Sequence, residues 1–98
     1  MIIAIQVVVE FLSSLFNITR EKSATESLQA GATVQELLEA MRDRYGTEFE
    51  TRIFTAENRL NSYVIILING VDIRSMNGIG TILHDSDKVT LIPSIAGG

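Results

Sequence analysis

The sequence predicts one α+β domain of two layers, in which a helix packs on one face of a mostly antiparallel sheet. Residues 2–11 and 63–68 are β-branched, apolar runs typical of strands, and residues 33–45 show the periodicity of an amphipathic helix. A helix and a sheet that bury one face against each other form a two-layer domain. The chain of 98 residues is long enough for one such core and too short for two domains.

The first part of the chain predicts two strands joined by an irregular connection. In residues 2–11 only Gln6 and Glu10 interrupt a run rich in Ile and Val, and this composition favours a strand. Residues 12–23 are expected to form an irregular connection with room for one helical turn. Residues 24–28 can pair back as a short edge strand.

Residues 33–45 are the most strongly predicted element. Thr33 is a favourable N-cap, and Glu36 completes a capping box in which each side chain accepts from the other residue's backbone N–H. Gly46 follows where a left-handed C-terminal cap would lie. The apolar stripe of this helix is expected to be core rather than a cofactor site, and it comprises Val34, Leu37, Leu38, Met41 and Tyr45.

The second part of the chain predicts three more strands. Residues 47–62 have mixed polarity and indicate a long connection that could include one helical turn. After the apolar strand 63–68, Asn69-Gly70 is a strong signal for a two-residue hairpin turn. A short return strand at 71–73 and a last strand at 88–92 complete the predicted sheet.

Two aspartates, Asp85 and Asp87, precede the last strand and could be interpreted as an acid/base or metal pair. We favour local hydrogen bonds from these carboxylates to backbone N–H groups of the turn. His84 is expected to be solvated, because the sequence offers it no second ligand and no orienting partner. No metal site is therefore predicted.

The composition of the chain argues against several classes of function. The net charge of −4 argues against binding to nucleic acid or to an anionic membrane. The absence of cysteine gives no support for a disulfide framework, a zinc site or a thiol nucleophile, and the single histidine suggests no Ser-His-Asp arrangement. The N-terminus lacks the basic region of a signal peptide, and no apolar run is long enough to span a membrane. We expect a soluble, cytoplasmic protein with no bound cofactor.

The order of the predicted elements indicates which two-layer fold the chain adopts. The predicted order is strand, strand, helix, strand, short strand, strand. If the first and last strands lie side by side in the middle of the sheet, they run parallel and the crossover between them is right-handed. This arrangement is the β-grasp, with four to five strands and one main helix.

A short tail follows the last strand. We therefore divide the chain into a domain at 1–93 and a tail at 94–98, Ser-Ile-Ala-Gly-Gly. Because Gly97 and Gly98 have no side chains, the tail could pass through a narrow channel and present its terminal carboxylate to an enzyme. Taken alone, a terminal Gly-Gly is a weak motif that can also arise by chance.

Three segments carry a resemblance to a known family. Residues 31–38 resemble the G-x-T-V-x-E-L-L run that opens the helix in the molybdopterin synthase small-subunit family, the MoaD-like ubiquitin-fold sulfur carriers. Residues 83–93 resemble the family's L-x-D-x-D-x-V-x-L-x-P run, and residues 94–98 resemble its ending. The resemblance spans the chain in order. It departs from the family at Ser86, where the family commonly has Gly, and over residues 17–27.

The resemblance implies a reaction at Gly98. In related systems an E1-like adenylating enzyme uses ATP to activate the terminal glycine, and sulfur from a persulfide donor displaces AMP to leave a thiocarboxylate. Gly98 would then be the reacting residue, as a substrate rather than a catalyst. The implied partners are this enzyme, the persulfide donor and the MoaE-like large subunit of molybdopterin synthase. The residues that would line a partner's channel are Pro93, Ser94, Ile95, Ala96 and Gly97.

The sheet carries a second hint of partner binding. Residues 7–9 and 64–68 are apolar at every position, although a sheet face without a helix usually alternates to polar residues. Either that face is apolar, or the connection at 47–62 lies over it. An apolar face would mark a protein interface, and we predict Ile66 and Ile68 as its contact residues. The alternative is a locally thick core.

Three functions remain open. The first is a sulfur carrier that serves as the small subunit of molybdopterin synthase in molybdenum or tungsten cofactor biosynthesis, a role that the Pro93-x-x-x-Gly-Gly ending favours. The second is a carrier for tRNA thiolation or thiazole synthesis, or a ubiquitin-like protein modifier. The third is a non-covalent β-grasp interaction module. In none of them is the chain expected to be catalytic on its own.

Overall fold

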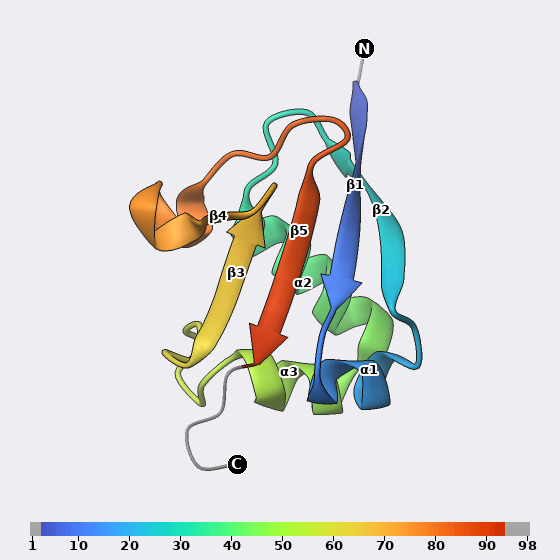
Figure 1. The fold of residues 1–98 in the computed structure, drawn as a ribbon, viewed down its shortest axis with the longest axis vertical. Helices are drawn as coiled ribbons and strands as arrows, with labels where there is room; N and C mark the ends of the chain where they lie inside the picture. Colours follow the sequence, from blue (N-terminus) through green and yellow to red (C-terminus); the bar gives the residue numbers. More distant parts are fainter. Residues whose placement is uncertain (1–2, 94–98) are drawn as a thin grey trace.

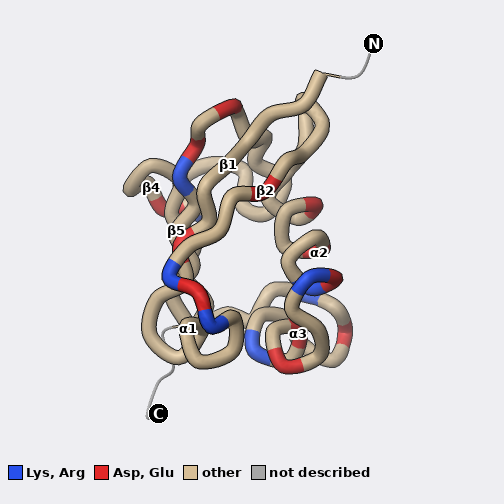
Figure 2. Tube along the Cα trace, turned by 90° about the vertical axis from the view of Figure 1, so that its right-hand side faces the viewer, with Lys and Arg blue, Asp and Glu red and all other residues tan. Residues whose placement is uncertain are grey.

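The computed structural model describes residues 3–93. Five strands form one mixed sheet in the order β2-β1-β5-β3-β4 (Figure 1). Helices α2 and α3 lie on one side of the sheet, and the opposite face carries no helix (Figure 2). The elements are β1 Ala4–Phe11, α1 Ser14–Thr19, β2 Ser23–Gln29, α2 Val34–Tyr45, α3 Thr47–Ile53, β3 Val64–Ile68, β4 Val71–Asp72 and β5 Lys88–Pro93, with short 3-10 turns at Ile73–Ser75 and Gly78–Gly80.

The pairing of strands confirms the predicted β-grasp. β1 and β5 lie side by side in the middle of the sheet and run parallel, with Val9 opposite Val89. β2 pairs antiparallel with β1 on one side, and β3 pairs antiparallel with β5 on the other. The first and last strands therefore form the centre of the sheet. The chain leaves β5 between its neighbours β1 and β3.

Helix α2 is confirmed together with its predicted cap. The Glu36 N–H donates to the Thr33 hydroxyl at 3.3 Å, and the Thr33 N–H donates to the Glu36 carboxylate at 3.1 Å. The apolar stripe faces the sheet, and Val34, Leu37, Leu38 and Met41 are fully buried. The capped start and the buried stripe together fix the helix on the sheet.

The connection after α2 is more regular than expected. Instead of one turn, it contains the seven-residue helix α3, which buries Phe49 and Ile53 completely. Gly46 joins the two helices with φ 86° and ψ −159°, so its backbone is not in the predicted left-handed helical conformation. Because α3 lies in the helix layer (Figure 2), this connection does not cover the open face of the sheet.

Two turns place polar side chains around the start of β5. Asn69 and Gly70 both have positive φ, 50° and 86°, as the predicted two-residue hairpin turn requires. The Asp87 carboxylate accepts from the His84 N–H at 2.8 Å, as expected, whereas Asp85 accepts from the N–H of Gln6 in β1 at 2.8 Å rather than from its own turn.

Candidate functional site

The candidate site is the end of β5, where the chain leaves the sheet (Figure 1). Pro93 is the last residue of β5 and lies opposite Val64 of β3. On the other side, the Leu12 N–H donates to the Leu91 carbonyl at 3.2 Å. β3 thus pairs with the last strand up to its final residue, and β1 holds it up to Leu91, so the exit point of the tail is fixed within the domain.

Most of the predicted tail contacts lie outside the described residues. These are Ser94, Ile95, Ala96, Gly97 and the reacting residue Gly98. Pro93 is described, and it is buried at the end of β5. Its ring is therefore not available to line a partner's channel, and this part of the prediction is wrong.

The prediction that Ile66 and Ile68 contact a partner is also wrong. Their side chains are 1% and 5% exposed and belong to the core between the sheet and α2. Successive residues of a strand point to opposite faces, so the open face carries Ile65 and Leu67, which are half-buried. The predicted contact residues therefore lie on the core side of β3, and the open face carries the residues between them.

The open face combines apolar and polar groups. Ile65 lies opposite Ile92, and Leu67 lies opposite Thr90. Beside them, the Thr90 hydroxyl donates to the Glu10 carboxylate at 3.1 Å, and the Lys88 ammonium lies 3.4 Å from the same carboxylate. The face is therefore apolar towards the exit of the tail and polar away from it.

Three large side chains near the exit are exposed and were not predicted as site residues. Leu12 and Phe16 are each 41% exposed on the β1 side, and Tyr63, next to Val64, is 38% exposed on the β3 side. For Leu12 and Phe16 the sequence signal was the apolar content of residues 12–18, which is equally typical of core, and Tyr63 belonged to a predicted strand. Single exposed apolar residues are common, but a group around one point marks an interaction site.

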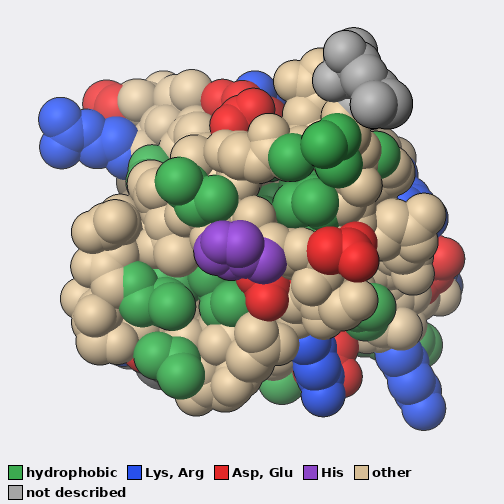
Figure 3. Space-filling view, turned by 90° about the horizontal axis from the view of Figure 1, so that it is seen from above, with side chains coloured by type: hydrophobic (Ala, Val, Ile, Leu, Met, Phe, Trp, Pro, Cys, Tyr) green, Lys and Arg blue, Asp and Glu red, His purple; other side chains and the backbone are tan. Residues whose placement is uncertain are grey.

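Apolar side chains also gather at the opposite end of the molecule, which Figure 3 shows around the exposed histidine. Val71, Met76 and Ile82 are about half exposed there and line a hollow with His84. Because this hollow lies at the start of β5, it is separated from the exit by the length of that strand.

Two ionisable groups of the described residues have shifted pKa values, and each shift arises from local structural contacts. Burial and a hydrogen bond to Glu21 raise the pKa of Tyr45 to about 12. Side-chain and backbone hydrogen bonds from Arg74 lower the pKa of Asp72. Within residues 3–93 there is no group of three His, Asp or Glu side chains that could hold a metal ion, and no helix there has the length and apolar character needed to cross a membrane.

Comparisons with known proteins agree with this geometry. A protein from Archaeoglobus fulgidus, described as an inferred sulfur carrier, is 29% identical over 66 residues, which are 67% of this chain and 74% of that protein. Small archaeal modifier protein 1 from Methanosarcina acetivorans has a TM-score of 0.85 at 28% identity, with 97% of this chain and 98% of that chain covered. A chain of the Amycolatopsis orientalis BexX/CysO complex has a TM-score of 0.75 at 29% identity, with coverages of 94% and 99%.

Topology and comparisons together define the class as a ubiquitin-like β-grasp protein of the kind that includes sulfur carriers. The ThiS family model matches residues 9–98, and the chain belongs to the ThiS family.

Proposed function

We propose that this protein is a sulfur carrier whose terminal carboxylate at Gly98 is converted to a thiocarboxylate. The family match carries the proposal, because it runs to Gly98 and includes the strand that leads to the tail. The fold supports it, since β3 pairs with β5 up to Pro93 and β1 pairs with it up to Leu91. A fixed domain can then be bound while the tail enters a partner's active site.

The chemistry needs a partner at each step. An E1-like adenylating enzyme would join the Gly98 carboxylate to the α-phosphate of ATP and release pyrophosphate. The terminal sulfur of a persulfide would then displace AMP to give an acyl disulfide, and a thiol would reduce this to the thiocarboxylate. The chain supplies no cysteine of its own, so the sulfur and the reducing thiol both come from other proteins.

We infer that the acceptor is the pterin precursor of the molybdenum or tungsten cofactor, with this chain as the small subunit of molybdopterin synthase. The ending Pro93-x-x-x-Gly-Gly and the run at 83–93 support this role. The large subunit would bind the open sheet face around Ile65, Leu67 and Ile92, because that face is apolar beside the tail. Localisation in the cytoplasm follows from such partners as part of the same proposal.

A second candidate is attachment of Gly98 to lysines of other proteins. It is favoured by the likeness to a protein named small archaeal modifier protein 1 at 28% identity. Carriers for tRNA thiolation or thiazole synthesis share the first chemical steps, and a non-covalent interaction module shares only the fold.

The acceptor can be tested with the thiocarboxylated protein. We expect it to convert the pterin precursor to a dithiolene product when a purified large subunit of molybdopterin synthase is added, with return of the free carboxylate at Gly98. Covalent conjugates to lysine, found by mass spectrometry without turnover of the pterin, would instead establish the modifier role.

A further inference from the structure

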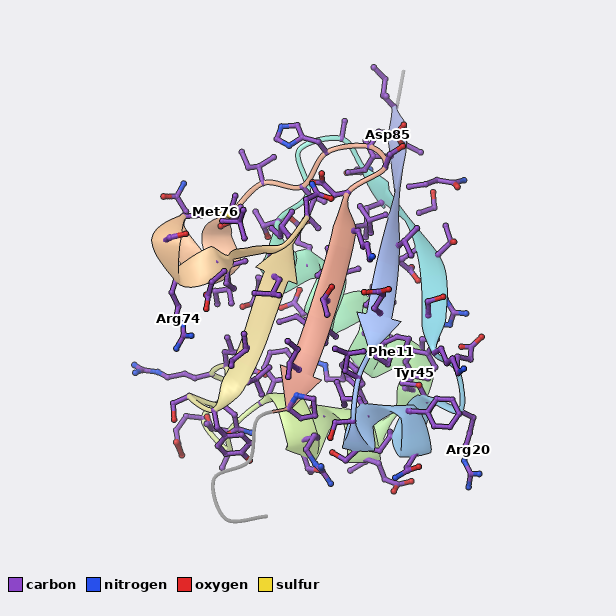
Figure 4. The ribbon with its side chains drawn as sticks, in the orientation of Figure 1. Phe11, Arg20, Tyr45, Arg74, Met76 and Asp85 are labelled. Carbon is purple, nitrogen blue, oxygen red and sulfur yellow. The ribbon has the colours of Figure 1, made fainter. Side chains whose placement is uncertain are left out.

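One flank of the exit carries two exposed basic residues, although the protein as a whole is acidic. From Phe11 to Arg20 the sequence holds no acidic residue, and Lys22 follows closely. Arg20 and Lys22 are both exposed, and neither makes an ion pair with another residue of the described range. Figure 4 shows Arg20 beside α1, pointing away from the domain. We call the segment from Leu12 to Lys22 the α1 flank.

The acidic residue within the α1 flank does not neutralise these cations. Glu21 lies between them in sequence. Its carboxylate accepts from the Tyr45 hydroxyl at 2.5 Å and lies 3.6 Å from Arg44. The Glu21 carboxylate therefore pairs with side chains of α2, and Arg20 and Lys22 remain without an acidic partner among the described residues.

The α1 flank also contains an apolar hollow. Leu12 and Phe16, each 41% exposed, line it together with Phe11, and Glu10, Ser13 and Lys22 complete its lining. The Glu10 carboxylate is already engaged by Lys88 and Thr90. The hollow thus offers an apolar floor with an unpaired ammonium group at its edge.

The backbone around α1 is held in a conformation that keeps these side chains outward. Ser13 and Arg20, at the two ends of the helix, have φ values of 57° and 63°, which non-glycine residues rarely adopt. Such conformations persist only where the surrounding structure enforces them. Here Arg52 of α3 donates to the Ser14 hydroxyl, and the buried Thr19 donates to the Glu21 carbonyl at 2.9 Å. The surface is preformed, which lowers the entropic cost of binding.

We propose that the α1 flank binds an acidic segment of the adenylating enzyme, with an apolar side chain of that segment in the hollow of Leu12 and Phe16. Carboxylates beside that side chain would pair with Arg20 and Lys22, whereas a basic surface would meet like charges. A second copy of this chain docked symmetrically would bring its own two cations to the same place, so a copy is disfavoured. This inference rests on the proposed function, because it names a surface of the activating partner.

The position of the flank lets one enzyme hold it and the tail together. The Leu12 N–H bonds the Leu91 carbonyl at 3.2 Å, two residues before β5 ends at Pro93. The hollow is therefore close enough to the exit for one enzyme to contact it while the tail lies in that enzyme's active site.

Steady-state thiocarboxylation of the full chain by its purified adenylating enzyme tests the proposal. The charge variant is Arg20→Gln with Lys22→Gln, and its matched control is Arg74→Gln, an exposed cation on the opposite side of the sheet from α1 (Figure 4). We expect the KM for the carrier to rise by about tenfold in the charge variant with kcat unchanged, because the lost contacts steer and hold the complex. The KM of the wild type should also rise with salt, and that of the charge variant should not.

A second pair of variants tests the hollow. Phe16→Ala should raise the KM, whereas Met76→Ala, at the opposite end of the molecule, should not. Melting temperatures check that each variant is folded, and Lys22→Gln alone serves if the double variant unfolds. Equal KM values for the charge variant and Arg74→Gln, or a KM of the wild type that is independent of salt, would overturn the inference. If the wild type itself gains no sulfur, the proposed function fails instead.

Discussion

Asn69 and Asp87 join the hairpin after β3 to the turn before β5. The Asn69 amide donates to the Asp87 carboxylate at 2.8 Å, and the amide oxygen accepts from the Lys88 N–H at 3.0 Å. One side chain therefore fixes the start of the strand whose other end carries the tail. In the sequence these residues belong to two separate turns, and only the sheet order brings them together.

Replacing Asn69 with glycine should destabilise the domain by about 1–2 kcal/mol, because two hydrogen bonds are lost while the positive φ of 50° is tolerated. The free energy of unfolding in urea measures this. If Asn69→Gly lowers the free energy of unfolding no more than an ordinary surface substitution does, the turn geometry alone sets the register of the strands.

Ser86→Gly should stabilise the protein. Ser86 has φ 69°, and a left-handed conformation costs a non-glycine residue about 1–2 kcal/mol, partly offset by the greater freedom of glycine when unfolded. We expect a net gain of about 0.5–1 kcal/mol in urea unfolding. Ser62→Gly, at an exposed position without positive φ, is the control and should destabilise slightly.

The two faces of β3 should respond differently to substitution. Ile66→Ala removes a fully buried side chain and should cost about 2–4 kcal/mol of unfolding free energy. Ile65→Ala, on the open face, should cost less than about 1.5 kcal/mol because the side chain is only half-buried. Binding to the large subunit, measured by calorimetry, should weaken in Ile65→Ala. Unchanged binding there would remove the open face from the interface.

Tyr45 should make stability fall at high pH. Burial and the Glu21 bond raise its pKa to about 12 in the folded state, above about 10 in the unfolded chain. Between these values the folded state holds a proton that the unfolded state has lost, so the free energy of unfolding decreases as pH rises from 10 towards 12. The stabilisation that arises from the raised pKa of Tyr45 is fully present below pH 10.

Urea unfolding of wild type and Tyr45→Phe between pH 9 and 11.5 isolates this effect. The difference in free energy of unfolding between wild type and Tyr45→Phe should shrink with rising pH, because the hydrogen bond to Glu21 is lost. A difference that stays constant with pH would show that the Tyr45 hydroxyl ionises as it does in the unfolded chain.

Local patterns explain what the sequence could predict. Helix α2 was predicted with its cap because Thr33 and Glu36 are three residues apart and the apolar stripe repeats at helical spacing. A strand was predicted at 63–68, but a continuous apolar run does not show which residues face the core. The faces of Ile66 and Ile65 were therefore interchanged.

Other features depend on tertiary structure. Helix α3 has only seven residues, and it exists because Phe49 and Ile53 fill the core beneath it rather than through its own propensity. The exposure of Leu12 and Phe16 follows from positive φ values at Ser13 and Arg20, residues that carry no glycine-like signal. The exit of the tail was predicted as a site, whereas the α1 flank beside it was not.

The measurement that tests the central claim most directly is the intact mass of the full chain after incubation with its adenylating enzyme, ATP, a persulfide sulfur donor and a thiol reductant. We predict a mass gain equal to one oxygen replaced by sulfur, absent without ATP and absent after deletion of Gly98. An unchanged mass, with the enzyme shown to be active in ATP–pyrophosphate exchange with this chain, would contradict the sulfur-carrier account.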